Sequence, residues 1–280
     1  MGRKSPYQIV FSDVDGTLLN QNRELSELTI QQIQRITNKY NVKFVMVSAR
    51  MPEGMKYLYD QLSFESPMIC YNGALILKEW NGKFDPKNII HSNSIDLNTI
   101  RQLYNKVKDE GLHFGVFSNN YWYANKHDEW TKKEEHNTRV KCTISPNIEE
   151  LISELEKNQS PIHKIMIMGE SSKIESALNF SNANFSEAIT NYRPKVNYIE
   201  VTPKCTNKAN GCIILMDYLG IEHRNSIAFG DNFNDIEMLR MAGIGIAVEN
   251  AHPQVKENAT QTTQSNLNDG VALSLIEIYE

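Results

Sequence analysis

Two acidic residues that follow the first apolar run of the chain are well placed to do chemistry. Asp13 and Asp15 stand two positions apart after residues 7–10, which are typical of a buried strand, and Gly16 follows them. Residues two apart on an extended chain point to the same side, and ligands of open α/β sheets bind where the strands end. Two carboxylates this close need a cation, a shared proton or both. A divalent metal, with one carboxylate as nucleophile and the other as acid and base, would use both groups.

The same residue types also occur in plain turns and in calcium-binding loops. An EF-hand loop that began at Asp13 would place Glu24 at its twelfth position, but Thr17 would stand at the fifth and the glycine at the sixth would be absent. The apolar strand in front of the pair favours a site over a turn alone.

Two further polar residues stand where predicted elements begin or end. Ser48 follows the apolar residues 43–47, and its hydroxyl with nearby backbone amides suits a phosphate oxygen; capping of the next helix is an equal alternative. Lys208 stands at a predicted helix start, where the helix dipole disfavours a cation. An anion or nearby carboxylates would offset that cost, and the alternative is a lysine exposed to solvent.

A second acidic pair follows another apolar strand. Asp231 stands at the end of the predicted strand 226–229, and Asp235 stands four residues later at a predicted helix start. Oxygen ligands at this spacing suit octahedral Mg²⁺, which retains several water molecules. The alternative is a capping arrangement, with Asp231 or Asn232 as the cap and Asp235 favoured by the helix dipole.

The elements that must position these residues alternate between strand and helix in the N-terminal part of the chain. Short links between them predict parallel strands joined by right-handed crossovers. The predicted strands are 9–11, 43–47, 68–70 and 75–77, and the predicted helices are 26–40 and 53–62. The pattern resumes towards the C-terminus, with strands at 198–201, 226–229 and 243–248 and helices at 208–219, 234–241 and 271–279.

The middle of the chain has a different character, richer in aromatic and polar residues. Its predicted helices lie near 97–109, 148–158 and 173–180, and its predicted strands near 113–117, 122–124 and 163–168. The fold class that follows is α/β. A core domain with a doubly wound parallel sheet, residues 1–82 and 194–280, carries an inserted α+β domain, residues 83–193.

Composition narrows the class of protein. Of 280 residues, 40% are hydrophobic and 22% are charged, which is typical of a globular protein, and the net charge of −5 without a basic block argues against a nucleic-acid partner. Residues 1–5 are basic but lack the apolar core of a signal peptide, and no run is long enough to span a membrane. The cysteines lack CxxC spacing, so reduced thiols in the cytoplasm are expected. They are Cys70, Cys142, Cys205 and Cys212.

Taken together, the four chemical segments resemble the motifs of the haloacid dehalogenase superfamily of aspartate-nucleophile phosphatases. Within it, the chain is most similar to the Cof-type branch of sugar-phosphate phosphatases, subclass IIB, whose large α/β cap lies between the second and third motifs. The resemblance covers nearly the whole chain. The segments that carry it are 13–19, 71–74, 230–239, 250–251 and 266–272.

The resemblance implies a role for each matching residue. Asp13 would attack phosphorus and form an aspartyl-phosphate, and Asp15 would protonate the leaving oxygen and then activate water. Mg²⁺ would be held by Asp13, the backbone carbonyl of Asp15, Asp231 and, mostly through water, Asp235. The phosphate-binding groups would be Lys208, Ser48, Asn234, Asn72 and the backbone amides near Val14 and Ala49. Mg²⁺ and Lys208 would neutralise the like charges, so that an anionic nucleophile can approach an anionic phosphate.

One segment departs from the family pattern. The family usually has Thr-Gly-Arg where this chain has Ser48, Ala49 and Arg50. Serine keeps the hydroxyl, whereas alanine keeps the backbone amide but cannot adopt every glycine conformation.

In the inserted segment, aromatic residues could stack on a sugar, but packing of a small sheet is the favoured interpretation. They are Tyr121, Trp122, Tyr123 and Trp130, with His127 beside them; no role is predicted for His113, His163 or His223.

The predicted function is Mg²⁺-dependent hydrolysis of small phosphate monoesters, with sugar phosphates as the expected substrate class. A phosphomutase, which returns the phosphoryl group to its substrate, is a related alternative. A receiver domain of a response regulator would share the acidic residues, hydroxyl and lysine, but it would be far shorter and would lack Asp15. A phosphate sensor without turnover would be expected to have lost Asp13 or Asp15. No oligomeric state is predicted.

Overall fold

The structure is a computed structural model that describes residues 6–280, with Pro194 described in its backbone only. Residues 1–5, where the sequence predicts no signal peptide, lie outside the described residues. The chain divides into two compact units. Unit 1 comprises the described residues up to Ala49, Lys56–His91 and Asn207–Glu280, and unit 2 comprises Arg50–Met55 and Ser92–Thr206.

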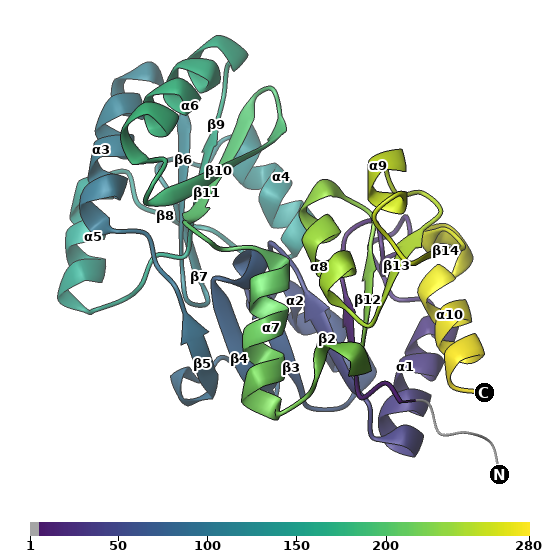
Figure 1. Cartoon of the computed structure of the whole chain (residues 1–280). Helices are drawn as coiled ribbons and strands as arrows, with labels where there is room; N and C mark the ends of the chain where they lie inside the picture. The colour runs from purple at the N-terminus through teal and green to yellow at the C-terminus, as the bar shows by residue number, and fades with distance from the viewer. Residues whose placement is uncertain (1–5) are drawn as a thin grey trace. The chain divides into compact units, whose positions relative to one another are not determined.

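Unit 1 is built on a sheet of eight strands in the order β14-β13-β12-β1-β2-β3-β4-β5, counted within the described residues (Figure 1). The neighbours from β14 to β3 are parallel, and β4 is antiparallel to β3. Strands β1, β2 and β12 therefore end at the same edge, as the sequence predicts. Their bounds are β1 Ile9–Ser12, β2 Lys43–Val47, β3 Ser66–Cys70, β4 Leu75–Trp80, β5 Ile89–Ser92, β12 Ser226–Gly230, β13 Ile244–Val248 and β14 Gln261–Thr263.

Helices cover both faces of this sheet, which confirms the doubly wound α/β class. On one face, Ile9 and Phe11 of β1 pack with apolar residues of α7 and α8. Alternate residues such as Val10 point to the other face, where α1 and α10 lie side by side (Figure 1). The helices are α1 Glu27–Tyr40, α2 Glu53–Leu62, α7 Lys208–Leu219, α8 Ile236–Met241, α9 Pro253–Lys256 and α10 Gly270–Ile278, with 3₁₀ turns at Tyr71–Gly73, Pro86–Asn88, His223–Asn225, Phe233–Asp235 and Asn266–Asn268.

Unit 2 is built on a second sheet, in the order β10-β11-β9-β6-β7-β8. Its pairs are antiparallel except β7 with β8. Apolar residues of α3, α5 and α6 pack against one face of this sheet. The bounds are β6 His113–Ser118, β7 Tyr121–Ala124, β8 Thr143–Ile144, β9 Lys164–Met168, β10 Ile189–Lys195, β11 Tyr198–Pro203, α3 Leu97–Val107, α4 Glu129–Thr138, α5 Ile148–Lys157 and α6 Ser171–Phe185, with a 3₁₀ turn at Lys108–Glu110.

The sequence interpretation of residues 198–201 as a strand of the first sheet is wrong. Strand β11 pairs with β9 and β10 in the second sheet. Both of its faces are buried, so its apolar pattern identifies a buried strand but not the sheet that it joins. The hairpin that β11 forms with β10 places β11 in the second sheet. The sequence did not predict β10, which contains Asn191, Arg193 and Pro194. The predicted boundary at residue 193 falls inside β10, and the predicted start at residue 83 precedes β5 of the first sheet.

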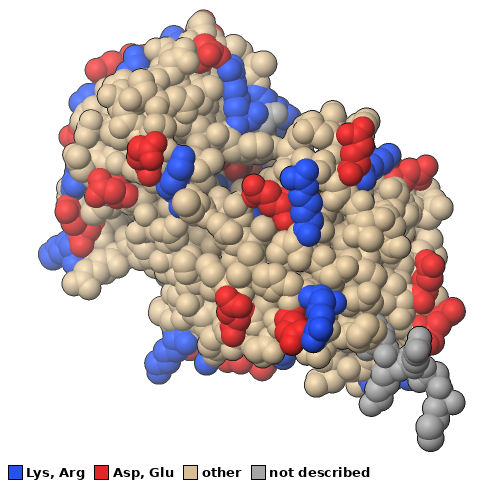
Figure 2. Space-filling view, in the orientation of Figure 1, with Lys and Arg blue, Asp and Glu red and all other residues tan. Residues whose placement is uncertain are grey.

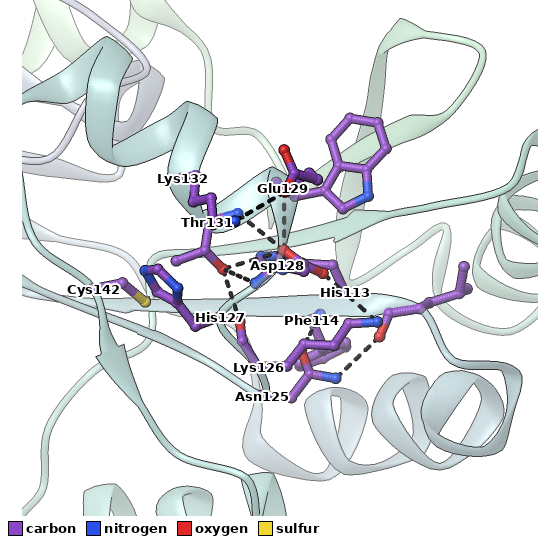
Figure 3. Close-up of polar contacts among 12 residues, drawn as sticks. His113, Phe114, Asn125, Lys126, His127, Asp128, Glu129, Thr131, Lys132 and Cys142 are labelled. Atoms are coloured by element: carbon purple, nitrogen blue, oxygen red, sulfur yellow. Dashed lines mark hydrogen bonds and ion pairs between the residues drawn. The ribbon is translucent and has the colours of Figure 1, made fainter.

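The sequence also did not predict α4, whose ten residues are polar apart from Trp130 and include only two buried side chains, Thr131 and Thr138. Its start is fixed instead by a cap. Oδ1 of Asp128 accepts hydrogen bonds from the backbone nitrogens of Trp130 and Thr131, both at 3.0 Å, and Figure 3 shows Asp128 beside Thr131. The buried His113 of β6 lies against the same oxygen, with its Nδ1 at 3.1 Å. A histidine without a predicted role thus holds the helix cap.

We expect this histidine to make stability depend on pH. Burial lowers the pKa of His113, and the Asp128 carboxylate only partly offsets the effect. Below the ordinary pKa of about 6.5 the unfolded chain therefore binds more protons than the folded chain, so stability falls as the pH drops from 7 to 5. Urea unfolding at both pH values should show a smaller fall in His113→Asn, which keeps an amide donor near Asp128.

The exposed His223 offers a matched control for that measurement. His223→Asn should show the same fall in stability from pH 7 to pH 5 as the wild type. Burial also lowers the pKa of His91, but His91 contributes equally in the wild type and in both variants. An unchanged decline in His113→Asn would contradict the prediction.

Among residues 6–280, no helix combines the length and the apolar character that crossing a bilayer requires.

Candidate active site

The first motif leaves β1 directly into the candidate site. Asp13 follows the strand, is buried, and donates its backbone N–H to the carbonyl of Phe229 on the neighbouring β12 at 3.0 Å. The chain then turns at Gly16, whose φ of +91° lies in the left-handed region. A Cβ on Gly16 would lie 2.6 Å from Oδ2 of Asp231, so only glycine lets the two acidic loops approach this closely.

The hydroxyl of Thr17 connects the same two loops. Thr17 is buried and donates from Oγ1 to Oδ1 of Asp231 at 2.7 Å, across 214 positions of sequence. This threonine lies in the first motif, but the sequence alone predicts no role for it. The available signal was its position directly after the turn glycine, in the motif that carries Asp13 and Asp15.

Lys208 is the cation of the cluster. It is the first residue of α7, it is buried, and its Nζ donates to Oδ1 of Asp13 and, at 2.6 Å, to Oδ1 of Asp235. The helix starts here because the side chain of Asn207 accepts the backbone N–H of Asn210 at 2.7 Å. The interpretation of Lys208 as a solvent-exposed lysine is therefore wrong, because the two carboxylates offset its position at the helix N-terminus.

The loop after β12 is organised by Asp235. Its Oδ2 accepts the backbone N–H groups of Asp231 and Asn232, each at 3.0 Å, while its Oδ1 accepts from Lys208. This carboxylate is fully buried. Asp235 thus fixes the loop that carries Asp231, and both of its oxygens already accept hydrogen bonds.

The charges of this cluster are unbalanced. Burial raises the pKa of Asp13 well above its ordinary value, with the Asp235 and Asp231 carboxylates adding to the rise and Lys208 opposing it. Burial also raises the pKa of Asp231. Burial by itself lowers the pKa of Lys208, but the Asp13 and Asp235 carboxylates outweigh it and raise that pKa above its ordinary value. The site therefore favours additional positive charge.

A divalent cation fits the donor set. Asp13, Asp231 and Asp235 each offer an oxygen, and these oxygens all lie within 4.8 Å of one another. Three carboxylates and one ammonium leave a formal charge of −2, which one divalent cation would neutralise. Hard carboxylate oxygens are the ligands that Mg²⁺ and Ca²⁺ prefer. The side chain of Asp15 is not part of this cluster.

Three predicted phosphate-binding residues lie on neighbouring loops of unit 1. The buried Ser48 follows β2, and its carbonyl accepts the backbone N–H of Asn72 at 2.9 Å. The side chain of Asn72 accepts a hydrogen bond from Nδ2 of Asn234 at 3.3 Å. The structure therefore joins the loops after β2, β3 and β12, as the sequence predicts from their places at strand ends.

The loop after β3 holds its backbone in an unusual conformation. Tyr71 and Asn72 both have left-handed φ angles, of 51° and 54°, which are uncommon outside glycine and are found at functional sites. Gly73 completes the turn with a φ of +104°, and a Cβ there would lie 2.6 Å from the carbonyl of Asn207. The loop can therefore pack directly against the start of α7, where Lys208 stands.

The remaining predicted residues differ in exposure. Val14 is fully buried, so its side chain is part of the core, and Ala49 is half-buried. Asp15 is exposed, and Nη1 of Arg23 lies 3.1 Å from its Oδ1. Sequence reasoning missed Arg23, which stands eight positions after Asp15 without any periodic pattern to connect them.

The predicted aromatic residues of unit 2 differ in their surroundings. Trp122 is buried and stacks on Phe117, with ring centroids 5.6 Å apart and an interplanar angle of 5°, which agrees with packing of the sheet. Tyr121 is exposed. Trp130, on α4, lines a cavity of about 100 Å³ together with Lys133, Glu134, Asn137, Met168, Lys195, Asn197 and Tyr198.

Charged residues on the one face drawn in Figure 2 show no large segregation. On the face drawn in Figure 2, the Lys and Arg side chains are interspersed with Asp and Glu, and several lie in adjacent pairs of opposite sign. This pattern is typical of a solvated surface rather than of a basic binding patch.

Comparison with known proteins identifies the family. A model of the haloacid dehalogenase-like hydrolases matches residues 10–275. A Haemophilus influenzae protein provisionally named a phosphatase is 32% identical over 279 residues, which cover 98% of each chain. The Bacillus subtilis protein YitU, named 5-amino-6-(5-phospho-D-ribitylamino)uracil phosphatase, is 29% identical over 280 residues, again 98% of each chain.

The fold agrees with these matches. The crystal structure of a haloacid dehalogenase-like hydrolase from Bacteroides thetaiotaomicron superposes with a TM-score of 0.88 at 24% identity, covering 98% of this chain and 100% of that one. The large second unit with its own sheet agrees with the Cof-type branch. The family model spans nearly the whole chain, and the motif residues converge at one edge of the sheet. The chain therefore belongs to the haloacid dehalogenase-like hydrolase family and is an enzyme of its phosphatase group.

Proposed function

We propose that this enzyme hydrolyses small phosphate monoesters, with Mg²⁺ as cofactor, through an aspartyl-phosphate on Asp13. One observation carries the proposal. Asp13 is buried at the end of β1, is held by Lys208, and lies in one cluster with Asp231 and Asp235. A buried carboxylate that is oriented by a lysine and surrounded by further carboxylates suits a nucleophile working beside a divalent cation.

The residues that would hold Mg²⁺ are Asp13, the backbone carbonyl of Asp15, and Asp231. Asp235 would contribute through water, since both of its oxygens already accept hydrogen bonds from Lys208 and from backbone amides. When bound, Mg²⁺ would neutralise negative charge and act as a Lewis acid on a phosphoryl oxygen. The hydrogen bond from Thr17 would hold Oδ1 of Asp231 in place.

In the first step, a carboxylate oxygen of Asp13 forms a bond to phosphorus while the bond from phosphorus to the ester oxygen breaks. Asp15 gives its proton to that oxygen, so the alcohol leaves neutral. Lys208 holds the nucleophile in place and supplies positive charge next to the transferring group.

In the second step, the ionised Asp15 takes a proton from water, and the water oxygen bonds to phosphorus. The bond from phosphorus to Asp13 breaks, which releases inorganic phosphate and restores the carboxylate. Asp15 ends the cycle protonated, ready for the next leaving group.

Groups on the neighbouring loops would hold the phosphoryl oxygens during both steps. The Ser48 hydroxyl, Asn234 and the backbone amides near Val14 and Ala49 are the proposed donors. Asn72 contributes by binding Nδ2 of Asn234 and so orienting it. Hydrogen-bond donors that the fold already orients before the reaction stabilise the transition state, because they need little reorganisation.

Sugar phosphates are the substrate class that we propose. The relative YitU is named for a ribityl phosphate ester, which is a phosphorylated polyol chain. Unit 2 would act as the cap that selects the leaving group, and Trp130 with Asn137 and Asn197 offers an indole and carboxamides that suit a polyol. The cysteines Cys70, Cys142, Cys205 and Cys212 are not joined in disulfides. Reduced thiols are usual in the cytoplasm, which is the location that we propose.

Phosphate release tests the reaction class. With a panel of sugar phosphates, Mg²⁺ should support release, and EDTA should lower the rate by at least about 10²-fold, because metal catalysis supplies several kcal/mol. Ca²⁺ should restore little, since it prefers more ligands and a looser geometry. Equal rates in EDTA would contradict the cofactor. An isomerised sugar phosphate without free phosphate would identify a phosphomutase instead.

A further inference from the structure

We propose that Arg23 is a positioning residue for Asp15: its guanidinium fixes the orientation of the carboxyl group that exchanges protons with the leaving group and with water. The inference rests on the proposed function, in which Asp15 is the acid and base. The contact that suggests it is the distance of 3.1 Å between Nη1 of Arg23 and Oδ1 of Asp15.

The need for such a residue follows from the surroundings of Asp15. Asp13, Asp231 and Asp235 are held by buried or partly buried hydrogen bonds, whereas the side chain of Asp15 is 45% exposed. An exposed carboxylate rotates between staggered conformers, and general acid catalysis requires one of them, with the transferring oxygen within hydrogen-bond reach of the ester oxygen. A partner that holds the carboxyl group fixes the direction in which it can transfer a proton.

Arg23 stands on a turn that is built to present it. The backbone nitrogens of Asn20 and Arg23 donate to the carbonyls of Glu24 and Asn20, each at 3.0 Å. The side chain of Asn20 accepts the backbone nitrogens of Asn22 and Glu24 at 2.9 and 3.2 Å. This turn is therefore closed twice, by its backbone and by one asparagine side chain.

The backbone of Arg23 is held in an uncommon conformation. Its φ is +59°, in the left-handed region that most residues avoid. The hydroxyl of Tyr57, on α2, donates to the carbonyl of Arg23 at 2.9 Å and so connects the turn to the body of unit 1. Such conformations persist where the surrounding structure fixes them, and they cluster at functional sites.

A contribution to folding stability does not explain the ion pair between Arg23 and Asp15. The two side chains are 41% and 45% exposed, and ion pairs between exposed groups contribute little to folding. This contact adds little stability, yet it joins Arg23, which stands on its own hydrogen-bonded turn, to the proposed acid and base. A role in orienting Asp15 explains the contact better. The planar guanidinium suits that task, because its donors have a fixed geometry.

Steady-state kinetics of the full-length enzyme with Mg²⁺ separates orientation from substrate binding. With glucose 6-phosphate as probe, or another sugar phosphate if the panel favours it, Arg23→Gln should lower kcat about tenfold and leave KM nearly unchanged, because only an interaction used in the chemical step is lost. Arg23→Lys should recover part of the loss. A raised KM with unchanged kcat would overturn the inference and make Arg23 a substrate contact.

The leaving group supplies a second readout. In single turnovers that follow release of the alcohol, Arg23→Gln should slow glucose 6-phosphate much more than p-nitrophenyl phosphate, whose phenolate leaves without needing a proton. An equal loss for both substrates would overturn the inference, since a general structural defect affects both.

A double-mutant cycle ties the effect to Asp15. Asp15→Asn removes the group that Arg23 positions, so adding Arg23→Gln to that variant should cause no further loss of kcat. Additive losses would overturn the inference. The matched control is Arg224→Gln, which removes an exposed ion pair with Glu222 in the same unit and should keep wild-type kinetics.

Failure of the proposed function has a different signature. If Asp15→Asn hydrolyses glucose 6-phosphate as fast as the wild type, or if the wild type releases no phosphate at all, the mechanism itself is wrong and the role of Arg23 is wrong with it. If the wild type is active, Asp15→Asn is slow and Arg23→Gln is unimpaired, only the role of Arg23 is refuted.

Discussion

Replacement of Asp13 by asparagine is expected to abolish phosphate release, with a loss of about 10⁴-fold or more in kcat. The amide of asparagine is a poor nucleophile, and removal of a covalent nucleophile costs losses of this order in other hydrolases. The structure adds that no other carboxylate of the cluster can substitute easily, because Asp231 is held by Thr17 and Asp235 by Lys208 and backbone amides. Rates with p-nitrophenyl phosphate and with sugar phosphates measure the loss.

The same substitution should not destabilise the fold. Burial and the neighbouring carboxylates raise the pKa of Asp13, so the folded site disfavours its charge in the absence of metal. A neutral amide of the same shape removes that cost and still accepts a hydrogen bond from Lys208. Urea unfolding without Mg²⁺ should therefore give a stability equal to or above that of the wild type.

The matched control is Asp60→Asn. Asp60 is an exposed aspartate of unit 1 that pairs with Lys56, so its loss should affect neither activity nor stability appreciably. Activity that survives in Asp13→Asn at more than a few per cent of the wild-type rate would refute the aspartyl-phosphate mechanism.

Replacement of Lys208 by methionine is expected to have the largest effect on stability, a loss of about 3–5 kcal/mol in the free energy of unfolding. Breaking a buried ion pair leaves uncompensated charge in the interior, and losses of this size are typical. Here the lysine compensates two carboxylates, Asp13 and Asp235, so its loss leaves three carboxylates with no ammonium group hydrogen-bonded to them. Turnover should also fall, because the nucleophile loses the donor that orients it.

Mg²⁺ should recover part of that stability. A cation that binds the folded state alone stabilises it in proportion to its occupancy, and it would supply the positive charge that the variant lacks. Unfolding in urea with and without Mg²⁺ should therefore show a larger metal effect in Lys208→Met than in the wild type. The activity should not recover, since Mg²⁺ does not replace the contact with Oδ1 of Asp13.

Lys204 provides the control for Lys208. It stands four positions earlier, is exposed, and donates from Nζ to the backbone carbonyl of Ser186 at 2.6 Å. Lys204→Met should change stability by less than about 0.5 kcal/mol, as surface substitutions usually do. If the two variants proved equally stable, the assignment of Lys208 as the cation of the buried cluster would be wrong.

The sequence by itself determined which polar residues stand at strand ends along one edge of the sheet. Asp13, Ser48 and Asp231 each stand directly after an apolar strand, and consecutive strand–helix–strand units place parallel strand ends at one edge. Helix starts could also be predicted, because the signals are local: Ser26 accepts the N–H of Thr29 and begins α1 as expected. Where the information lies within a few residues, periodicity and capping chemistry are sufficient.

Only the tertiary structure decided how distant residues pair. The apolar pattern of strand β11 is typical of a buried strand in either sheet. Only its pairing with β9 and β10 shows that it belongs to the second sheet. Helix α4 has no apolar stripe, and its start depends on Asp128 and the buried His113.

The contacts that refine the site are of the same kind. Thr17 with Asp231, and Arg23 with Asp15, depend on where loops fold back onto one another. These contacts connect residues by geometry rather than by spacing, and neither hydrophobic period nor local propensity encodes that geometry. The residue types and their places at strand ends therefore predicted the chemistry, while the tertiary fold determined which side chains orient it.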